Sequence, residues 1–270
     1  MEFGLLPPYR EGVAADPEWM RGFAGAADRL GFESIYAVEH LLDEHRIPDP
    51  IDLLAYLAGV TDRIVLATGV LVLPLHAPVP LAKRLTTLDV LSGGRLRLGV
   101  GVGRRREEFE VAGVDFTTRG ARTDEMIQAL RVIWAADVAS FNGRHVAFDG
   151  VVSRPRTVRP AGIPIHVGGR SEAAAVRAGR LGDGFQPLDL DDETLTERLR
   201  TLWETAVESG RDPDSIELTL SGRLDEVDDA AIASAERFGA ARLVLSTRER
   251  RLDDAVAQLE RFARQYVDAR

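Results

Sequence analysis

Short apolar segments rich in β-branched residues alternate with longer segments of helical periodicity along the whole chain of 270 residues. The expected strands are Glu2–Leu6, Ser34–Val38, Ile64–Val72, Leu96–Val100, Ile163–Val167, Gly184–Leu188, Ser215–Ser221 and Arg242–Ser246. The expected helices are Glu18–Leu30, Pro50–Val60, Pro78–Leu91, Arg119–Ala135, Ser171–Leu181, Asp192–Glu208, Asp229–Phe238 and Leu252–Tyr266. Eight such repeats in a chain of this length predict an α/β fold, the (β/α)8 TIM barrel. The alternative is an open doubly wound sheet, which usually has fewer units.

One stretch, residues 137–160, interrupts the alternation. Within it, Phe141–His145 contains an Asn-Gly pair, which is typical of a tight hairpin turn. We therefore expect a loop or hairpin insertion before the fifth strand. No low-complexity segment or charge run divides the chain, so residues 1–270 are expected to form a single domain.

Composition excludes several classes of protein. A formal net charge of −9 argues against a nucleic-acid binder, which needs concentrated positive charge. The longest apolar run, Ile64–Leu75, is too short to span a membrane, and the amino terminus lacks the features of a signal peptide. We therefore expect a cytoplasmic protein without membrane contact. The absence of cysteine excludes disulfides, thiolate nucleophiles and cysteine-ligated metals.

The second expected strand runs into Glu39 and His40. Barrel enzymes carry their chemistry at the carboxyl ends of the strands. Because histidine titrates near neutral pH, His40 is a candidate proton donor or acceptor; the alternative is a surface histidine beside a solvated carboxylate. A metal site is not expected, because Glu39, His40, Glu44 and His45 lack the helical spacing of the common zinc motif.

The fifth strand is followed by the glycine-rich segment Gly168–Ser171, where a helix begins. Accessible backbone N–H groups and the positive end of the helix dipole predict an anion site suited to phosphate. The alternative is a glycine-rich turn without a ligand. His166, inside this strand, is either a residue of the barrel interior or a ligand contact.

Two other strands carry glycines at or near their ends. Gly69 interrupts a β-branched run in the third strand, which indicates either a bulge, a close approach to a ligand or a packing glycine. The fourth strand runs into Gly99–Gly103, but a dinucleotide-binding G-x-G-x-x-G pattern fails, because Arg104 or Arg106 occupies the place of the third glycine.

In their order and spacing, these strand ends resemble the bacterial luciferase-like monooxygenase superfamily, and most closely its branch of coenzyme F420-dependent (deazaflavin) oxidoreductases. The last third of the chain is similar only in its alternation. The matching segments are Gly31–Ser34, Glu39-His40, Pro48–Pro50, Thr61–Ile64, Gly69–Pro74, Leu88–Arg95, Gly99–Gly103, Arg105–Phe109, Arg119–Glu125, Pro164–Gly169 and Leu181–Phe185.

The resemblance implies a barrel that binds coenzyme F420, or alternatively FMN, at its carboxyl-end mouth, and a homodimer. His40 would be the catalytic residue near the reactive ring edge. A non-prolyl cis peptide between Gly69 and Val70 would form a bulge behind the ring. Tyr9 and Arg10, just past the first strand, are weaker candidates for substrate contact. The implied cofactor-binding residues are Glu39, Gly69, Val70, Leu71, Gly103, Arg104, Glu107, Val167, Gly168, Gly169, Arg170 and Ser171.

The chain departs from the related sugar-phosphate dehydrogenases. They carry a glutamate where this chain has Arg104, and a tryptophan shortly after the histidine, where Leu41–Asp43 offers none. Sugar-phosphate oxidation is therefore not expected, and an arginine near the ring favours an anionic substrate or the charged tail of the cofactor.

The leading hypothesis is an F420-dependent oxidoreductase that transfers a hydride between the cofactor and a small organic substrate. Lys83 is the sole lysine and Asn142 the sole asparagine, which indicates a GC-rich gene and is a circumstantial indication for F420. The alternatives are an FMN-dependent monooxygenase that uses reduced flavin and oxygen, and a non-catalytic cofactor-binding barrel. A phosphate-handling lyase or isomerase would need a lysine within a strand, whereas Lys83 lies on an expected helix.

Overall fold

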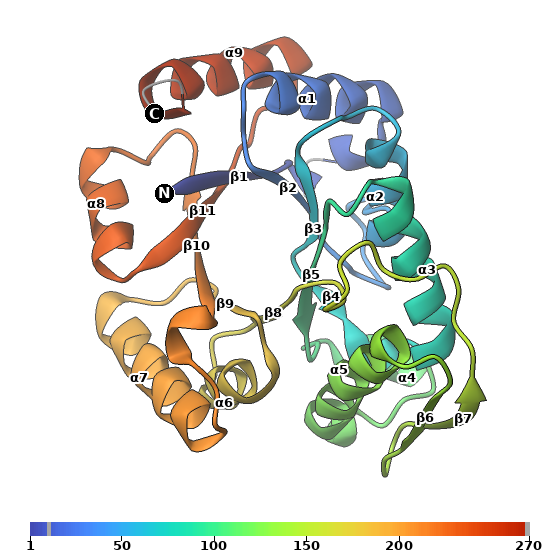
Figure 1. The fold of residues 1–270 in the computed structure, drawn as a ribbon. Coiled ribbons are helices and arrows are strands. Elements are labelled where there is room, and N and C mark those ends of the chain that lie inside the picture. The colour runs from blue at the N-terminus through green and yellow to red at the C-terminus, as the bar shows by residue number, and fades with distance from the viewer. Residues whose placement is uncertain (10–11, 268–270) are drawn as a thin grey trace.

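The structure is a computed structural model that describes residues 1–9 and 12–267. In this part of the chain, eight parallel strands form a closed barrel at the centre of the molecule (Figure 1). β1 pairs with both β2 and β11, and β3 pairs with β5, which closes the ring and confirms the expected (β/α)8 barrel. The barrel strands are β1 (Glu2–Leu6), β2 (Ser34–Ala37), β3 (Val65–Thr68), β5 (Leu96–Gly101), β8 (Ile165–Gly168), β9 (Gly184–Gln186), β10 (Glu217–Arg223) and β11 (Ala240–Ser246).

Helices surround the barrel (Figure 1). The outer helices are α1 (Pro17–Arg29), α2 (Pro50–Ala58), α3 (Pro78–Leu91), α5 (Arg119–Ala135), α6 (Glu172–Leu181), α7 (Asp192–Glu208), α8 (Asp229–Arg237) and α9 (Leu252–Phe262). Shorter helical turns are η2 (Val13–Ala15), η3 (Leu73–Leu75), α4 (Arg106–Val111), η4 (Phe116–Thr118), η5 (Pro213–Ser215) and η6 (Ala263–Val267). None of these helices combines the length and apolar composition that a membrane span requires.

Local signals explain where helices begin and end. The Asp16 carboxylate accepts hydrogen bonds from the backbone N–H groups of Glu18 and Trp19, and Pro17 occupies the first position of α1. Gly31, just after the same helix, has a φ of +79°, which glycine adopts without the steric cost of a Cβ.

The expected hairpin insertion is present between α5 and β8, formed by β6 (Ala139–Asn142) and β7 (Ala147–Val151). The Glu125 carboxylate of α5 holds its tip by accepting hydrogen bonds from the backbone N–H groups of Arg144, His145 and Val146. Burial alone would raise the pKa of Glu125, but these three donors lower it overall. The tip of the hairpin is therefore held against α5.

The barrel interior is narrow, because glycines on several strands face bulky neighbours. A Cβ on Gly99 would lie 2.0 Å from the carbonyl oxygen of Thr68, and one on Gly184 would lie 2.5 Å from Nδ1 of His166. The large apolar core instead lies between the barrel and the helices. Its side chains, such as Leu66 and Leu98, point outward from the strands.

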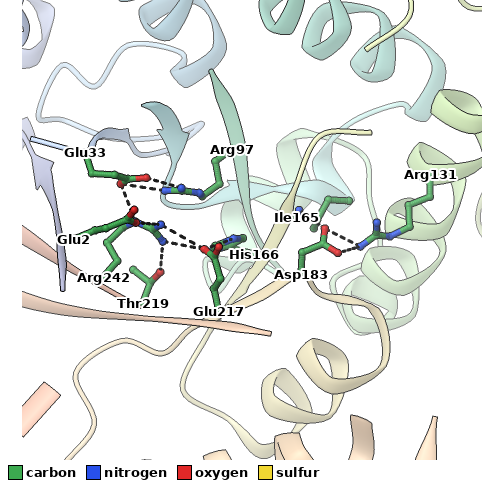
Figure 2. A network of polar contacts seen from close by, with 10 residues as sticks. All are labelled: Glu2, Glu33, Arg97, Arg131, Ile165, His166, Asp183, Glu217, Thr219 and Arg242. Carbon is green, nitrogen blue, oxygen red and sulfur yellow. Dashed lines mark hydrogen bonds and ion pairs between the residues drawn. The ribbon is translucent and has the colours of Figure 1, made fainter. Parts of the chain in front are cut away.

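A cluster of charged side chains, which we call the ionic plug, fills the amino-terminal end of the barrel (Figure 2). It consists of Glu2, Glu33, Arg97, Glu217 and Arg242. Arg242 is 1% exposed, and its guanidinium lies within 4 Å of carboxylate oxygens from the three glutamates. Barrel enzymes use this end for stability and the opposite end for chemistry.

His166 lies beside the ionic plug and not at the mouth of the barrel. Its Nε2 is 3.6 Å from a Glu217 carboxylate oxygen, and burial lowers the pKa of His166 well below the usual value, with Arg97 and Arg242 adding to this effect. Between the two possibilities left by the sequence, the structure supports a residue of the barrel interior.

Candidate active site at the carboxyl-end mouth of the barrel

The third expected strand, Ile64–Val72, is interrupted in the structure. β3 ends at Thr68, and the short strand β4 (Leu71–Val72) resumes the pairing with β5. Between the pairs Ala67↔Arg97 and Leu71↔Val100, this segment advances four residues against three on β5, so one extra residue forms a bulge. The peptide between Gly69 and Val70 is cis, as the resemblance implied.

Glycines at the ends of two neighbouring strands leave room for the bulge. A Cβ on Gly101 would lie 2.6 Å from Cγ2 of Val70, and a Cβ on Gly168 would lie 2.4 Å from its Cγ1. Real side chains do not approach so closely, and therefore only glycine accommodates Val70 at these two positions. The two glycines thus accommodate the Val70 side chain of the bulge at the ends of β5 and β8.

His40 lies past the end of β2 and faces α4. Its Nδ1 is 3.7 Å from a carboxylate oxygen of Glu108, which is 2% exposed. The same oxygen accepts a hydrogen bond from the backbone N–H of Leu42, and Arg105 pairs with Asp43 beside it. Burial lowers the pKa of His40 and the positive charge of Arg105 lowers it further, while Glu108 opposes both. These surroundings therefore favour the neutral form of the ring, which is the form that can accept a proton.

Glu39 has a different position from its neighbour. One of its carboxylate oxygens accepts a hydrogen bond from the backbone N–H of Val72, and the other lies 2.8 Å from Nε2 of His76. Both oxygens thus have partners within the protein. We therefore assign Glu39 to support of the bulge and β4, whereas the sequence predicted a cofactor contact.

The predicted anion site lies where β8 meets α6. Ser171 caps the helix, since its hydroxyl accepts a hydrogen bond from the backbone N–H of Ala174. The backbone N–H groups of Glu172 and Ala173, in the first turn, have no acceptor among the described residues. Gly169 adopts a φ of +138°. Free N–H groups at a helix start provide the chemistry that a phosphate requires.

Two predicted residues of this segment are less available than expected. Val167 is buried in the core. Arg170 is 62% exposed and lies 3.8 Å from Asp189, so its charge is partly offset. Leu71 is likewise buried.

The fourth strand end contributes a turn and a helix. Gly103 has a φ of +75°, and a Cβ there would lie 2.7 Å from Val72. Arg104 and Glu107 are exposed, whereas the next residue along α4, Glu108, takes the buried position facing His40. Glu108 is the principal site residue that the sequence prediction missed.

Of the two residues predicted for substrate contact, the structure describes one. Tyr9 is partly buried and lines a cavity of about 10 Å³ together with Tyr36, too small for a substrate. Arg10 lies outside the described residues.

The sequence model of the luciferase-like monooxygenase family matches residues 1–269. The chain belongs to this family. An uncharacterised protein of Mycobacterium tuberculosis is 31% identical over 265 residues, with 89% of this chain and 91% of that protein covered. Among solved structures, the monooxygenase RslO1 from Streptomyces bottropensis is similar with a TM-score of 0.87 and 24% identity, covering 100% of this chain and 99% of that one.

Two characterised relatives differ in their cofactors. The oxygenase component of the flavin-dependent trigonelline monooxygenase of Acinetobacter baylyi is 33% identical over 218 residues, which cover 78% of this chain and 60% of that protein. The F420-dependent glucose-6-phosphate dehydrogenase of Kineococcus radiotolerans is 30% identical over 231 residues, which cover 80% and 66%. The prediction of an oxidoreductase family with F420-dependent and flavin-dependent members is confirmed.

Proposed function

We propose that the protein is a coenzyme F420-dependent oxidoreductase that transfers a hydride between the cofactor and a small organic substrate. The observation that carries the proposal is the placement of His40, mostly neutral and facing a buried carboxylate, at the glycine-lined mouth that contains the Gly69–Val70 bulge. A mobile proton must accompany a hydride when a carbonyl and an alcohol interconvert. A neutral histidine at the mouth supplies the acceptor for it.

The residues present fit a flat, phosphate-bearing cofactor. Gly101 and Gly168 accommodate the bulge at Val70, and the start of α6 offers N–H groups without an acceptor among the described residues to a phosphate. Arg104 adds an exposed positive charge at the rim. When bound, coenzyme F420 supplies the two-electron hydride chemistry that no side chain can provide.

The protein's own groups orient and move the proton. His40 accepts or returns it at a ring nitrogen, and Glu108, 3.7 Å from Nδ1, stabilises the ring when it becomes positively charged. Arg105 and Asp43 form an ion pair next to Glu108, which fixes the loop after His40 against α4. Arg104 favours a substrate or cofactor tail with negative charge.

The second candidate is an FMN-dependent monooxygenase that uses reduced flavin and oxygen. The observation that favours it is the similarity to the flavin-dependent trigonelline monooxygenase, at slightly higher identity than the F420-dependent relative. The bulge at Gly69–Val70 and an anion site at the start of α6 would serve either cofactor. The homodimer expected from the resemblance belongs to both proposals, and light scattering after size-exclusion chromatography measures it.

The deciding experiment is a fluorescence titration of the purified protein with F420 and, separately, with FMN and its reduced form. We expect saturable binding of F420 at lower concentration than either form of FMN. Tighter binding of reduced FMN, with oxygen consumption, would replace the proposal with the second candidate. Binding of a cofactor without turnover across alcohols, carbonyls and small acids would favour a non-catalytic barrel.

The role of His40 is tested separately with His40→Ala. We expect turnover to be lost and the affinity for F420 to be retained, because the proposed role of the imidazole is to move a proton and not to bind the cofactor. The matched control is His45→Ala, an exposed histidine of the same loop. Equal turnover in the two variants would contradict the role of His40.

A further inference from the structure

A second cavity, of about 310 Å³, lies apart from the predicted cofactor residues, between the start of α3, α5 and the tip of the β6–β7 hairpin. Its volume is at the lower end of the range for small-molecule sites, about 300–1,000 Å³. The lining residues are Pro74, Leu75, His76, Ala77, Pro78, Val114, Arg122, Met126, His145 and Val146. None of them belongs to the predicted cofactor site.

The charge of this cavity has one sign. His76, Arg122 and His145 contribute three basic side chains, and no aspartate or glutamate is among the described lining residues. Arg122 donates from Nε to the hydroxyl of Thr118, and its two outer nitrogens have no partner among the described residues. The nearby carboxylate of Glu125 accepts hydrogen bonds from backbone N–H groups of the hairpin tip and is thus already engaged.

The start of α3 adds to this positive character. Ala77 is its N-cap residue, no side chain caps the helix, and its first turn contains no acidic residue. The positive end of the helix dipole is therefore not offset locally. Because Ala77 and Pro78 both line the cavity, this end of the helix borders the same space as the three basic side chains.

His76 connects the cavity to the active site. Its Nε2 lies 2.8 Å from Glu39, whose other carboxylate oxygen accepts the backbone N–H of Val72. A carboxylate partner requires the proton on Nε2, which leaves Nδ1 without a partner among the described residues. A ligand at His76 would thus contact the hydrogen-bond partner of Glu39, the residue that supports the bulge.

We propose that this cavity is a second ligand site, for a small carboxylate that carries an apolar body. The charge of the carboxylate matches the outer nitrogens of Arg122, because a guanidinium suits a bidentate contact with a carboxylate. The apolar body matches the remaining lining, which includes Leu75, Met126 and others without charge. The lining of this site includes no predicted cofactor-binding residue, although His76 contacts one of them, Glu39, and the proposal does not depend on which cofactor binds.

The test uses the full chain labelled with ¹⁵N-histidine and benzoate as the probe. The chain has five histidines, so each ring reports on its own surroundings. We expect saturable shifts of the His76 and His145 signals, without a matching change at His40. Shifts of His40 alone would place benzoate at the barrel mouth and overturn the proposal, as would the absence of saturation at any of the rings.

A matched pair of variants tests the charge. Arg122→Gln removes the guanidinium from the cavity. Arg106→Gln removes a guanidinium that stacks on Phe116 and does not line the cavity. Because Arg122→Gln removes a charge-assisted hydrogen bond, we expect it to weaken benzoate binding by at least about tenfold. Arg106→Gln should leave the affinity for benzoate unchanged. Equal weakening in both would indicate general electrostatic attraction and refute the site.

Two further measurements keep the result interpretable. Thermal unfolding identifies any variant that fails to fold. A separate variant, Val114→Phe, fills part of the cavity without changing its charge. We expect Val114→Phe to abolish the shifts of His76 and His145. Inorganic phosphate at the same ionic strength is the competing anion, and stronger binding of phosphate than of benzoate would contradict a site built for carboxylates with an apolar body.

Discussion

Replacing Arg242 with methionine tests whether the ionic plug stabilises the barrel. Arg242 is 1% exposed, and its Nε lies 2.7 Å from a carboxylate oxygen of Glu33, while Nη1 lies 3.3 Å from Glu217. Removing one partner of a buried ion pair costs about 3–5 kcal/mol, because the other charge stays buried. Glu217 is 49% exposed and Arg97 still pairs with Glu33, so we expect a loss near the lower limit, about 3 kcal/mol.

The assay is urea unfolding of Arg242→Met followed by far-ultraviolet circular dichroism, compared with Arg21→Met. Arg21 pairs with Glu18 on the exposed face of α1, where such a pair contributes about 1 kcal/mol or less. A free energy of unfolding for Arg242→Met within about 1 kcal/mol of the wild-type value would refute the reasoning, because the lower limit for a buried pair is about 3 kcal/mol.

The same variant has a pH signature through Glu33. Burial raises the pKa of Glu33, but Arg97 and Arg242 outweigh burial and lower it overall. A carboxyl whose pKa is lowered by folding adds stability above its unfolded pKa and loses it as the pH falls through its folded pKa. Without Arg242 the folded pKa rises, so Arg242→Met should lose stability at a higher pH than the wild type does during acid titration.

Three further changes test individual sites. Glu108→Gln should lower the pKa of His40 further, because the carboxylate that opposes burial is gone, and a rise or no change in an NMR titration would contradict the contact. Asp28→Asn should destabilise by about 1–3 kcal/mol in urea, since its carboxylate accepts three backbone N–H groups before β3. These donors lower the Asp28 pKa despite burial, so the loss should shrink as the pH falls below that pKa. Gly168→Ala places a Cβ 2.4 Å from the valine of the bulge and should weaken F420 binding, with Gly25→Ala on α1 as a control that leaves it unchanged.

Features that depend on local sequence could be predicted well. Strand β1 and helices α3, α5 and α7 have the expected bounds: α3 begins at Pro78 and α7 directly follows the capping residue Asp191. The hairpin insertion followed from its Asn-Gly turn in the same way. The division of the third strand did not follow from periodicity, since Val70 continues the apolar run on both sides of the bulge; the cis peptide there came from the resemblance.

Features that depend on side-chain direction could not be predicted. Arg104–Glu110 is a mixed charged segment, and nothing in its composition distinguishes Glu107, which is exposed, from Glu108, which faces His40. Which of the two glutamates is buried depends on how α4 is oriented by the turn before it, and Gly103 sets that turn. Arg242 presents the same difficulty, because an arginine beginning a predicted strand gives no sign of a partner more than 200 residues away in Glu33.

The end of β2 shows how two adjacent acid–base residues acquire different functions. Glu39 and His40 directly follow β2, and the two side chains have different partners. Glu39 is held by Val72 and His76 on one side, and both of its oxygens are engaged. His40, on the other side, has only the longer contact of 3.7 Å to Glu108 and keeps a ring nitrogen available at the mouth. Fixing the first residue therefore positions the second, which makes the bulge and the proposed proton acceptor parts of one structural unit.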